Sequence, residues 1–146
     1  MNEDAVFARV RESFSRQGMM AALGAVLDHA SPGRVVIGLP FSPAITQQHG
    51  FGHAGAIASI LDSACGYAAL TLMPEGKAVL TSEFKINLLA PAAGERFEAE
   101  GRIIRAGKRQ HVAMGEAFAI RNGTRKSIAV MLATLVVVDG EGGLSN

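Results

Sequence analysis

Several residue types are scarce in this chain of 146 residues. It holds one cysteine and no tryptophan, and aromatic residues make up only 5% of it. A single cysteine cannot close an intrachain disulfide, and it suits a reducing compartment. So few aromatic residues, with a formal net charge of +1, leave neither stacking platforms nor a basic stripe for nucleic acid. We therefore expect no nucleic-acid partner.

Long apolar runs and a basic leader are also missing. A membrane-spanning helix needs about 18 or more nearly continuous apolar residues, and the best runs, at 54–61 and 127–138, fall short of that length. Glu3 and Asp4 carry negative charge where a secretion signal carries bases. These features predict a soluble, cytoplasmic protein without a membrane partner.

One domain is the simplest organisation for this composition. Hydrophobic residues make up 49% of the chain, and a chain of this length can bury roughly 68–70% of its unfolded surface around one core. There is no internal repeat, low-complexity tract or linker. We expect a single domain over 1–146. Its segment 1–17 forms an amphipathic helix that stops at Gly18, and residues 139–146 form a flexible tail.

The rest of the pattern predicts one long helix and several strands. Residues 54–73 are apolar nearly all round, which is typical of a helix buried on every side. A hairpin is expected at 25–30 and 34–41, and further strands at 77–89, 95–105, 110–121 and 126–138, with consecutive strands paired antiparallel. The expected fold class is α+β, an antiparallel sheet wrapped around one long central helix. The unpaired edges of such a sheet favour at least a dimer.

Asp62 stands in the middle of the long apolar helix. An ionised carboxylate without partners is costly there, so it must be compensated or used. One interpretation is structural: Asp62 faces an open side of the helix or bonds a backbone donor at a subunit contact. The other is catalytic, because a carboxylate in such surroundings can act as a nucleophile or a general base.

A glycine-rich loop, QQHGFGHAG over 47–55, leads into the start of this helix. Free N–H groups and the positive end of the helix dipole can polarise a carbonyl there. The small residues Ala54 and Gly55 allow a substrate oxygen to come close. We predict an oxyanion site at the helix tip, with Asp62 two turns further along and near whatever that tip holds.

Two other residue types invite a functional reading. His49 and His53 are four apart, but the intervening glycines disfavour a helix and no third ligand stands at a recognisable spacing, so we expect no metal site. Cys65 lies in the densest part of the apolar helix, where a free thiol usually packs as a small hydrophobe. Core packing is therefore its expected role.

A basic cluster surrounds a predicted turn: Arg105, Lys108 and Arg109 flank Gly107. Most such clusters are solvated loop tips. The functional alternative is a cationic rim for a phosphorylated ligand.

The stretch QQHGFGHAGAIASILDSACGYAA over 47–69, followed by TSEFKINLLAP over 81–91, closely resembles the hotdog-fold acyl-CoA thioesterases of the phenylacetate-pathway (PaaI-like) type. The resemblance covers about residues 18–138. It implies a hotdog fold, with sites between two protomers of a homodimer or of a dimer of dimers, a homotetramer. Coenzyme A is then part of the substrate, and no separate cofactor is implied.

The family pattern carries over residue by residue. Gln47 matches the loop amide, fifteen residues before Asp62, and His53, Ala54 and Gly55 match the start of the helix, with alanine where glycine is commoner. The resemblance implies that the N–H of Ala54 or Gly55 binds the thioester carbonyl. It also implies that Asp62 attacks the carbonyl carbon or activates a water, and that Gln47 orients the water or the carbonyl.

The resemblance also assigns residues further along the chain. Thr81, or Ser82 beside it, matches a strand hydroxyl that the family supplies from the other subunit. The basic turn is implied to contact the phosphates of coenzyme A through Arg105, Gly107, Lys108 and Arg109.

The sequence therefore predicts an acyl-CoA thioesterase that hydrolyses a medium-chain or aryl acyl-CoA to the free acid and coenzyme A. Two alternatives keep the fold and change the class. One is a non-catalytic acyl-CoA-binding module that holds the thioester without cleaving it. The other is a hotdog hydratase or dehydratase, in which His53 and Asp62 transfer protons at the α and β carbons of the substrate.

Overall fold

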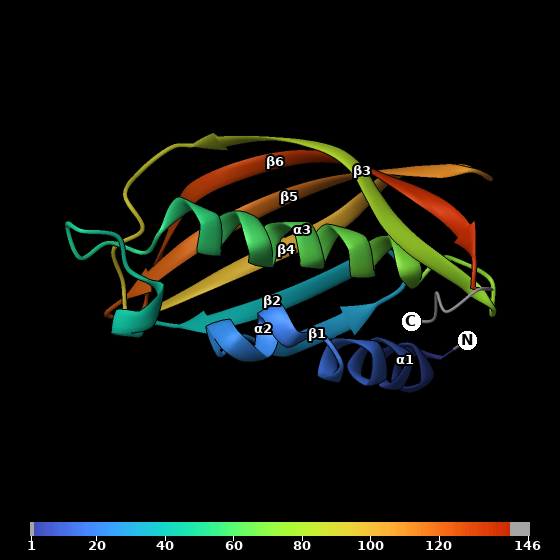
Figure 1. Cartoon of the computed structure of the whole chain (residues 1–146), viewed down its shortest axis with the longest axis horizontal. Helices are drawn as coiled ribbons and strands as arrows, with labels where there is room; N and C mark the ends of the chain where they lie inside the picture. Colours follow the sequence, from blue (N-terminus) through green and yellow to red (C-terminus); the bar gives the residue numbers. More distant parts are fainter. Residues whose placement is uncertain (1, 141–146) are drawn as a thin grey trace.

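The computed structural model of the protein describes residues 2–140. Six antiparallel strands form one sheet in the order β1-β2-β4-β5-β6-β3, and this sheet curves around the long helix α3 (Figure 1). The helical elements are α1 (Glu3–Ser15), α2 (Gly18–Leu23), the 3-10 turn η1 (Pro43–Ile45) and α3 (Ala54–Leu70). The strands are β1 (Val26–Ser31), β2 (Arg34–Pro40), β3 (Lys77–Leu88), β4 (Arg96–Ala106), β5 (Gln110–Arg121) and β6 (Thr124–Asp139). The α+β architecture with one long central helix is confirmed.

The central helix α3 forms because residues 54–70 are small or apolar helix formers with no proline before Pro74. It packs on β2 to β6, and most of its side chains are buried. At its end, the Arg9 guanidinium of α1 donates hydrogen bonds to the carbonyl oxygens of Leu70 (3.3 Å), Met73 (2.8 Å) and Pro74 (3.2 Å). These bonds satisfy carbonyls that a helix C-terminus leaves open, and they hold α1 against α3.

Two glycines set the depth at which α3 lies in the sheet. Gly101 of β4 and Gly115 of β5 face each other as register partners. A Cβ on Gly101 would overlap the backbone of Ala64, and one on Gly115 would lie 3.0 Å from the Cys65 sulfur. The helix backbone therefore rests on a flat patch where only glycine leaves enough room.

The expectation that consecutive strands pair antiparallel is confirmed for β1 with β2, β4 with β5 and β5 with β6, and it is wrong for β3, which pairs with neither β2 nor β4. β3 pairs with β6, and β4 pairs with β2 and β5. The connection from β3 to β4 is not a tight hairpin, because the N–H of Gly52 donates to the carbonyl oxygen of Ala92 at 2.8 Å and holds this connection beside the glycine-rich loop. The chain therefore crosses the sheet before β4 begins.

The first helix also differs from the expectation. Gly18 is not a simple stop, because it begins α2, and the extended Gln17 separates the two helices. The glycine that terminates a helix in the left-handed conformation is Gly24, with φ 77°. At the other end, β6 extends to Asp139, one residue into the expected tail, and residues 141–146 lie outside the described part.

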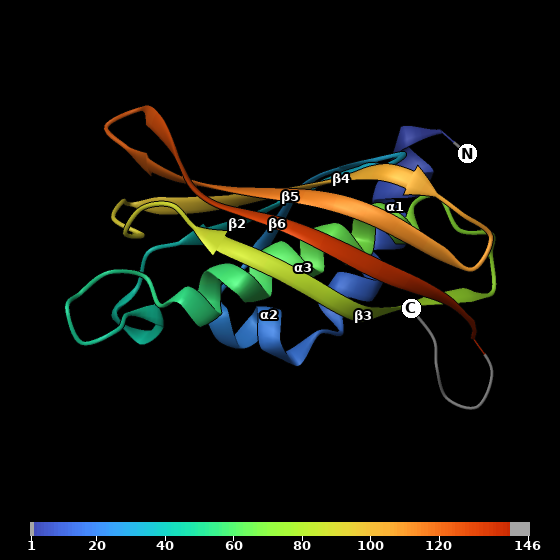
Figure 2. The ribbon, with the colours of Figure 1, turned by 90° about the horizontal axis from the view of Figure 1, so that it is seen from above.

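The two edges of the sheet are built differently. β1 is six residues long and packs against α1. β3 is twelve residues long, and within residues 2–140 no strand pairs with its outer side. Figure 2 shows β3 and β6 side by side over α3, with β3 at the margin. The exposed apolar side chains Leu80, Phe84 and Leu88 lie on this margin, so β3 is the edge open to a further strand.

Candidate active site

The start of α3 presents one free backbone donor. His53 is the N-cap, and its Nδ1 accepts a hydrogen bond from the N–H of Gly55 at 2.7 Å. No residue among 2–140 accepts from the N–H of Ala54, the first residue of the helix. Because Nδ1 is the acceptor, the proton of the neutral His53 ring is assigned to Nε2. The structure thus favours Ala54 over Gly55 as the donor at the tip.

The loop before the helix is held by its own hydrogen bonds. The backbone N–H of Gln47 donates to Phe51 O at 2.9 Å, and the N–H of Gly50 donates to Gln47 O at 3.0 Å. Gly50 has a φ of 84°, which favours glycine. The side-chain oxygen of Gln47 accepts from the N–H of His49. That bond orients the carboxamide and leaves its NH₂ group as a donor.

A pocket of about 520 Å³ lies where this loop meets the helix. Its polar residues are Gln47 and His53, next to the N–H of Ala54. The rest of the lining is largely apolar and comes from the glycine-rich loop, α3, β6, the end of β3 and the connection after it: Phe51, Ile57, Leu88, Leu89, Ala90, Pro91, Ala92 and Ile128. We call this the donor pocket, because its polar groups offer hydrogen-bond donors and no carboxylate.

Asp62 lies on the half-buried side of α3 and has a partner. The hydroxyl of Thr81 in β3 donates to its Oδ1 at 2.7 Å. β3 has a bulge between Thr81 and Glu83, which turns the hydroxyl of Ser82 away, to the carbonyl oxygen of Thr134 at 3.3 Å. Of the two candidate hydroxyls, Thr81 is therefore the one that contacts the carboxylate.

A second pocket, of about 460 Å³, surrounds this carboxylate. We call it the Asp62 pocket. Its walls come from the end of α1, the middle of α3 and the first half of β3. The lining residues are Ser13, Arg16, Gln17, Asp62, Ser63, Gly66, Tyr67, Val79, Leu80 and Thr81.

The two pockets share no lining residue. Asp62 is eight residues beyond Ala54, which places it about 12 Å along the helix axis at 1.5 Å per residue. The expectation that Asp62 lies near whatever its own helix tip holds is therefore wrong. Eight residues are somewhat more than two helical turns, which carries Asp62 beyond the reach of a small group bound at the tip. Thr81, implied to come from another subunit, contacts Asp62 of its own chain.

Cys65 has no catalytic surroundings. It is fully buried, and burial, with a smaller contribution from the charge of Asp62, raises the pKa of its thiol to about 12. The thiol stays protonated at neutral pH and cannot act as a nucleophile. The expected role in core packing is confirmed.

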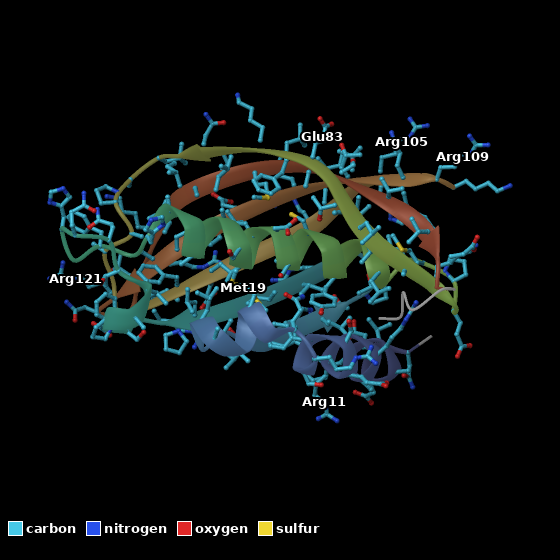
Figure 3. The ribbon with its side chains drawn as sticks, viewed as in Figure 1. Arg11, Met19, Glu83, Arg105, Arg109 and Arg121 are labelled. Carbon is cyan, nitrogen blue, oxygen red and sulfur yellow. The ribbon has the colours of Figure 1, made fainter. Side chains whose placement is uncertain are left out.

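The basic turn lies far from the donor pocket of the same chain. Arg105, Gly107, Lys108 and Arg109 line a hollow at the β4–β5 turn. Figure 3 shows Arg105 and Arg109 pointing outward at the end of the molecule opposite the glycine-rich loop. Any ligand that uses both regions must therefore reach across more than one chain or extend over the length of the domain.

Residues 2–140 contain no group of three or more His, Cys, Asp and Glu side chains placed to hold a metal ion. In the same residues, no helix has the length and hydropathy needed to cross a membrane.

Sequence reasoning missed four residues beside Asp62: Ser13, Arg16, Gln17 and Tyr67. The first three lie around the break between α1 and α2, at least 45 residues before Asp62 in the chain. No spacing rule connects them to the central helix. The sequence contains no sign of this contact, because the extended backbone of Gln17 between two helices is seen only in the structure.

The comparisons with known proteins agree with this architecture. The sequence matches the thioesterase superfamily over residues 49–126, and the chain belongs to that superfamily; its fold is the hotdog fold. A solved thioesterase family protein from Silicibacter pomeroyi is 50% identical, with a TM-score of 0.90 over 92% of this chain and 99% of that one. The PaaI protein of the E. coli phenylacetic acid degradation operon is 20% identical, with a TM-score of 0.82 over 93% and 95% of the two chains. That second likeness shows the fold alone.

A curated relative supports the same class. SSO2140 of Saccharolobus solfataricus, named as an inferred esterase, is 37% identical over 75 residues. This stretch is 51% of the present chain and 53% of that protein, so the chain spans about half the length of this relative.

Proposed function

We propose that the protein is an acyl-CoA thioesterase whose active sites are each shared by two copies of the chain. The observation that carries this proposal is the separation of Asp62 and the Ala54 N–H by about 12 Å along one helix. A base or nucleophile and an oxyanion donor must both reach one thioester group, each within about 3 Å. One chain cannot meet this requirement, and a second chain can.

A dimer with a two-fold axis would contain two such shared sites. If two α3 helices run antiparallel, Asp62 of one subunit faces Ala54 of the partner subunit, and the same contact repeats on the other side of the axis. The open edge of β3 supports this arrangement, because pairing the two β3 strands would cover their exposed apolar side chains and unpaired backbone groups. Such a dimer can pair further into a tetramer.

The polar groups of the two pockets then have complementary roles. The N–H of Ala54 of the partner subunit donates to the thioester oxygen, and the NH₂ of Gln47 orients that oxygen or the attacking water. Asp62 either takes a proton from the water as it attacks, or attacks the carbonyl carbon itself and forms an anhydride that water hydrolyses. In both cases the C–S bond breaks and coenzyme A leaves as a thiolate that takes up a proton. The Thr81 hydroxyl holds the carboxylate in place.

His53 has a defined part in this scheme. Its Nδ1 holds the first turn of α3 through Gly55, which fixes the direction of the Ala54 N–H. The exposed Nε2–H remains as a further donor. A hydratase or dehydratase would instead need His53 as a base, and its Nδ1 lone pair is already used.

The acyl group we propose is medium-chain or aryl, and the basic turn at Arg105, Gly107, Lys108 and Arg109 is the proposed site for the coenzyme A phosphates. Its three cations have the charge that phosphate groups require. Gly107 allows this turn to be narrow, because a Cβ there would lie 2.7 Å from Gln110 O.

The test is release of free thiol from acetyl-, hexanoyl-, lauroyl-, phenylacetyl- and hydroxybenzoyl-CoA by the parent protein and by Asp62→Asn. We expect turnover by the parent and a loss of about 10²–10⁴-fold in kcat for the variant. Glu83→Gln, which removes another exposed acid close to Thr81, is the matched control and retains activity. Saturable binding without turnover by the parent would favour the binding module, and hydration of an enoyl-CoA would favour the hydratase. Turnover by Asp62→Asn at the parental rate would refute the mechanism.

A further inference from the structure

The Asp62 pocket has a polar end that the proposed chemistry does not use. The side chain of Gln17 bridges two residues of α3: its Oε1 accepts from the Ser63 hydroxyl at 3.2 Å, and its Nε2 donates to the Tyr67 hydroxyl at 2.9 Å. The Tyr67 hydroxyl is also 3.2 Å from the hydroxyl of Ser13. Tyr67 and Ser13 are buried, so this network closes the pocket at the α1 side.

The network retains unused donors. Gln17 has two N–H groups on Nε2, and one of them is engaged by Tyr67. Arg16, exposed at the margin of the pocket, forms no ion pair with any acid among residues 2–140. A ligand oxygen placed here would therefore meet an amide donor and a cation.

Gly66 gives the pocket its width. It lies one turn beyond Asp62 on the same helix face, and a Cβ at this position would have no neighbour within 4 Å in the described chain. The packing of the chain therefore does not require glycine, although glycine is less favourable than alanine inside a helix. An alanine methyl would instead project toward the space that Asp62 and Tyr67 share.

The distance along α3 from Asp62 to the hydrogen-bonded Gln17 matches the length of an acyl group. The bridge formed by Gln17 spans Ser63 and Tyr67, one and five residues beyond Asp62, and so ends about 7.5 Å along the helix from the carboxylate. A thioester carbon held at Asp62 would place the far end of a six-carbon chain or of an aromatic ring at this bridge.

We propose that the Asp62 pocket is the acyl chamber, and that Gln17, with Arg16, selects acyl groups that carry an oxygen at their far end. This inference rests on the proposed thioesterase function and names its substrate class. The thioester end meets Asp62 and Thr81, the middle passes Gly66, and the terminal oxygen accepts a hydrogen bond from the Nε2 of Gln17. Gln17 is a specificity-determining residue in this arrangement and takes no part in the chemical step.

The test compares matched substrate pairs: 4-hydroxyphenylacetyl-CoA with phenylacetyl-CoA, and 6-hydroxyhexanoyl-CoA with hexanoyl-CoA. We expect the parent to prefer the hydroxylated member of each pair by about five- to tenfold in kcat/KM, as one hydrogen bond contributes. In Gln17→Leu the preference falls to about one, because kcat/KM falls more for the hydroxylated member of each pair than for the unsubstituted one. Gln48→Leu, an exposed glutamine outside both pockets, is the control and keeps the preference.

Other outcomes would overturn the inference in distinguishable ways. Turnover by the parent with equal rates for both members of a pair would refute the polar selection and leave the thioesterase proposal standing. An equal loss on all esters in Gln17→Leu would show that the pocket holds the pantetheine arm or that Gln17 only supports the fold. Absence of turnover on every ester would remove the proposed function together with this inference.

Gly66→Ala is an independent second variant. If Gly66 provides room for the acyl group, the melting temperature rises, the oligomeric state is unchanged, and kcat/KM falls more for phenylacetyl-CoA than for acetyl-CoA. A shift to monomers in size-exclusion chromatography would contradict the inference, because glycine would then serve a contact between helices.

Discussion

The two pockets on α3 contain different groups, and the proposed hydrolysis of a thioester needs both. The donor pocket offers N–H groups, from Ala54, Gln47 and His53, and no acid. The Asp62 pocket offers a carboxylate with its hydroxyl partner, and the free backbone donor is absent from it. Each half is stable in a folded chain because its groups have local partners, such as Gly55 for His53 and Thr81 for Asp62. The fold therefore prepares the two halves separately within one chain, and the proposed activity requires two chains to bring them together.

The largest effect on the donor half is expected from Ala54→Pro. Proline is tolerated at the first position of a helix and has no N–H, and His53 already has the extended backbone, with ψ 138°, that a following proline requires. We expect kcat to fall about 10²–10³-fold, with a melting temperature close to that of the parent. Ala54→Gly keeps the N–H and is the control. Activity of Ala54→Pro near the parental level would show that another donor holds the oxyanion.

Mixing two inactive variants tests whether the halves come from different chains. Subunits carrying Asp62→Asn and Ala54→Pro are co-expressed with different affinity tags, so that heterodimers can be purified. One site of each heterodimer then carries both defects and the other carries none, so the purified heterodimer should have about half of the parental activity, and the randomly paired mixture about one quarter. If each site instead used one chain only, every mixture would remain inactive, and the shared-site proposal would fail.

A smaller effect is expected within the carboxylate half. Thr81→Val removes the hydroxyl that donates to Asp62 while keeping a β-branched side chain in β3. A hydrogen bond to a charged group contributes about 1.5–3 kcal/mol, so we expect kcat to fall at least about tenfold. Ser82→Ala removes the neighbouring hydroxyl, which contacts Thr134 instead, and should change kcat little. Equal losses of kcat in Thr81→Val and Ser82→Ala would contradict the conclusion that only Thr81 contacts Asp62.

The smallest effect concerns a residue outside both pockets. His111 is 3% exposed, and burial lowers the pKa of its ring below the ordinary value of 6.5. Because the unfolded chain binds the proton more readily, this residue contributes stability that is fully present above about pH 6.5 and is lost as pH falls through the lower folded-state pKa. The melting temperature of His111→Asn should therefore fall less between pH 7.5 and pH 5 than that of the parent.

This pH experiment also serves the comparison of the two pockets. Loss of activity at low pH that results from unfolding can be recognised if melting and turnover are measured on the same samples. His49→Asn, at an exposed histidine, is the control for the replacement of a histidine by asparagine. A parental pH dependence in His111→Asn would show that other groups dominate.

The sequence predicted the parts of the fold that local patterning controls. The apolar run from Ala54 and the turn residues between the strands determined the long helix and the antiparallel strands. The pairing of β3 with β6 could not be predicted in the same way, because register partners such as Thr81 and Leu135 lie 54 residues apart in the chain. Nothing in the local sequence indicates a contact between such distant residues.

The candidate site was predictable only in its residue types. Asp62 stands out because a charge in an apolar helix needs a reason, and Ala54 because it is a small residue at the start of that helix. Gln47 follows from the family resemblance. The choice of Thr81 over Ser82 depends on a bulge, which strict alternation of side chains along a strand does not reveal. Gln17 depends on tertiary packing alone, since it reaches α3 from a break between two short helices.

The glycine patch under α3 gives the protein a fixed clearance between helix and sheet. Gly101 and Gly115 touch neither pocket, but any side chain at Gly101 would lift Ala64, two residues from Asp62, away from β4. The distance between Asp62 and Thr81 therefore depends on the absence of a Cβ atom at these two positions. A substitution at Gly101 or Gly115 would change none of the residues of the candidate site and would still change the distances between them.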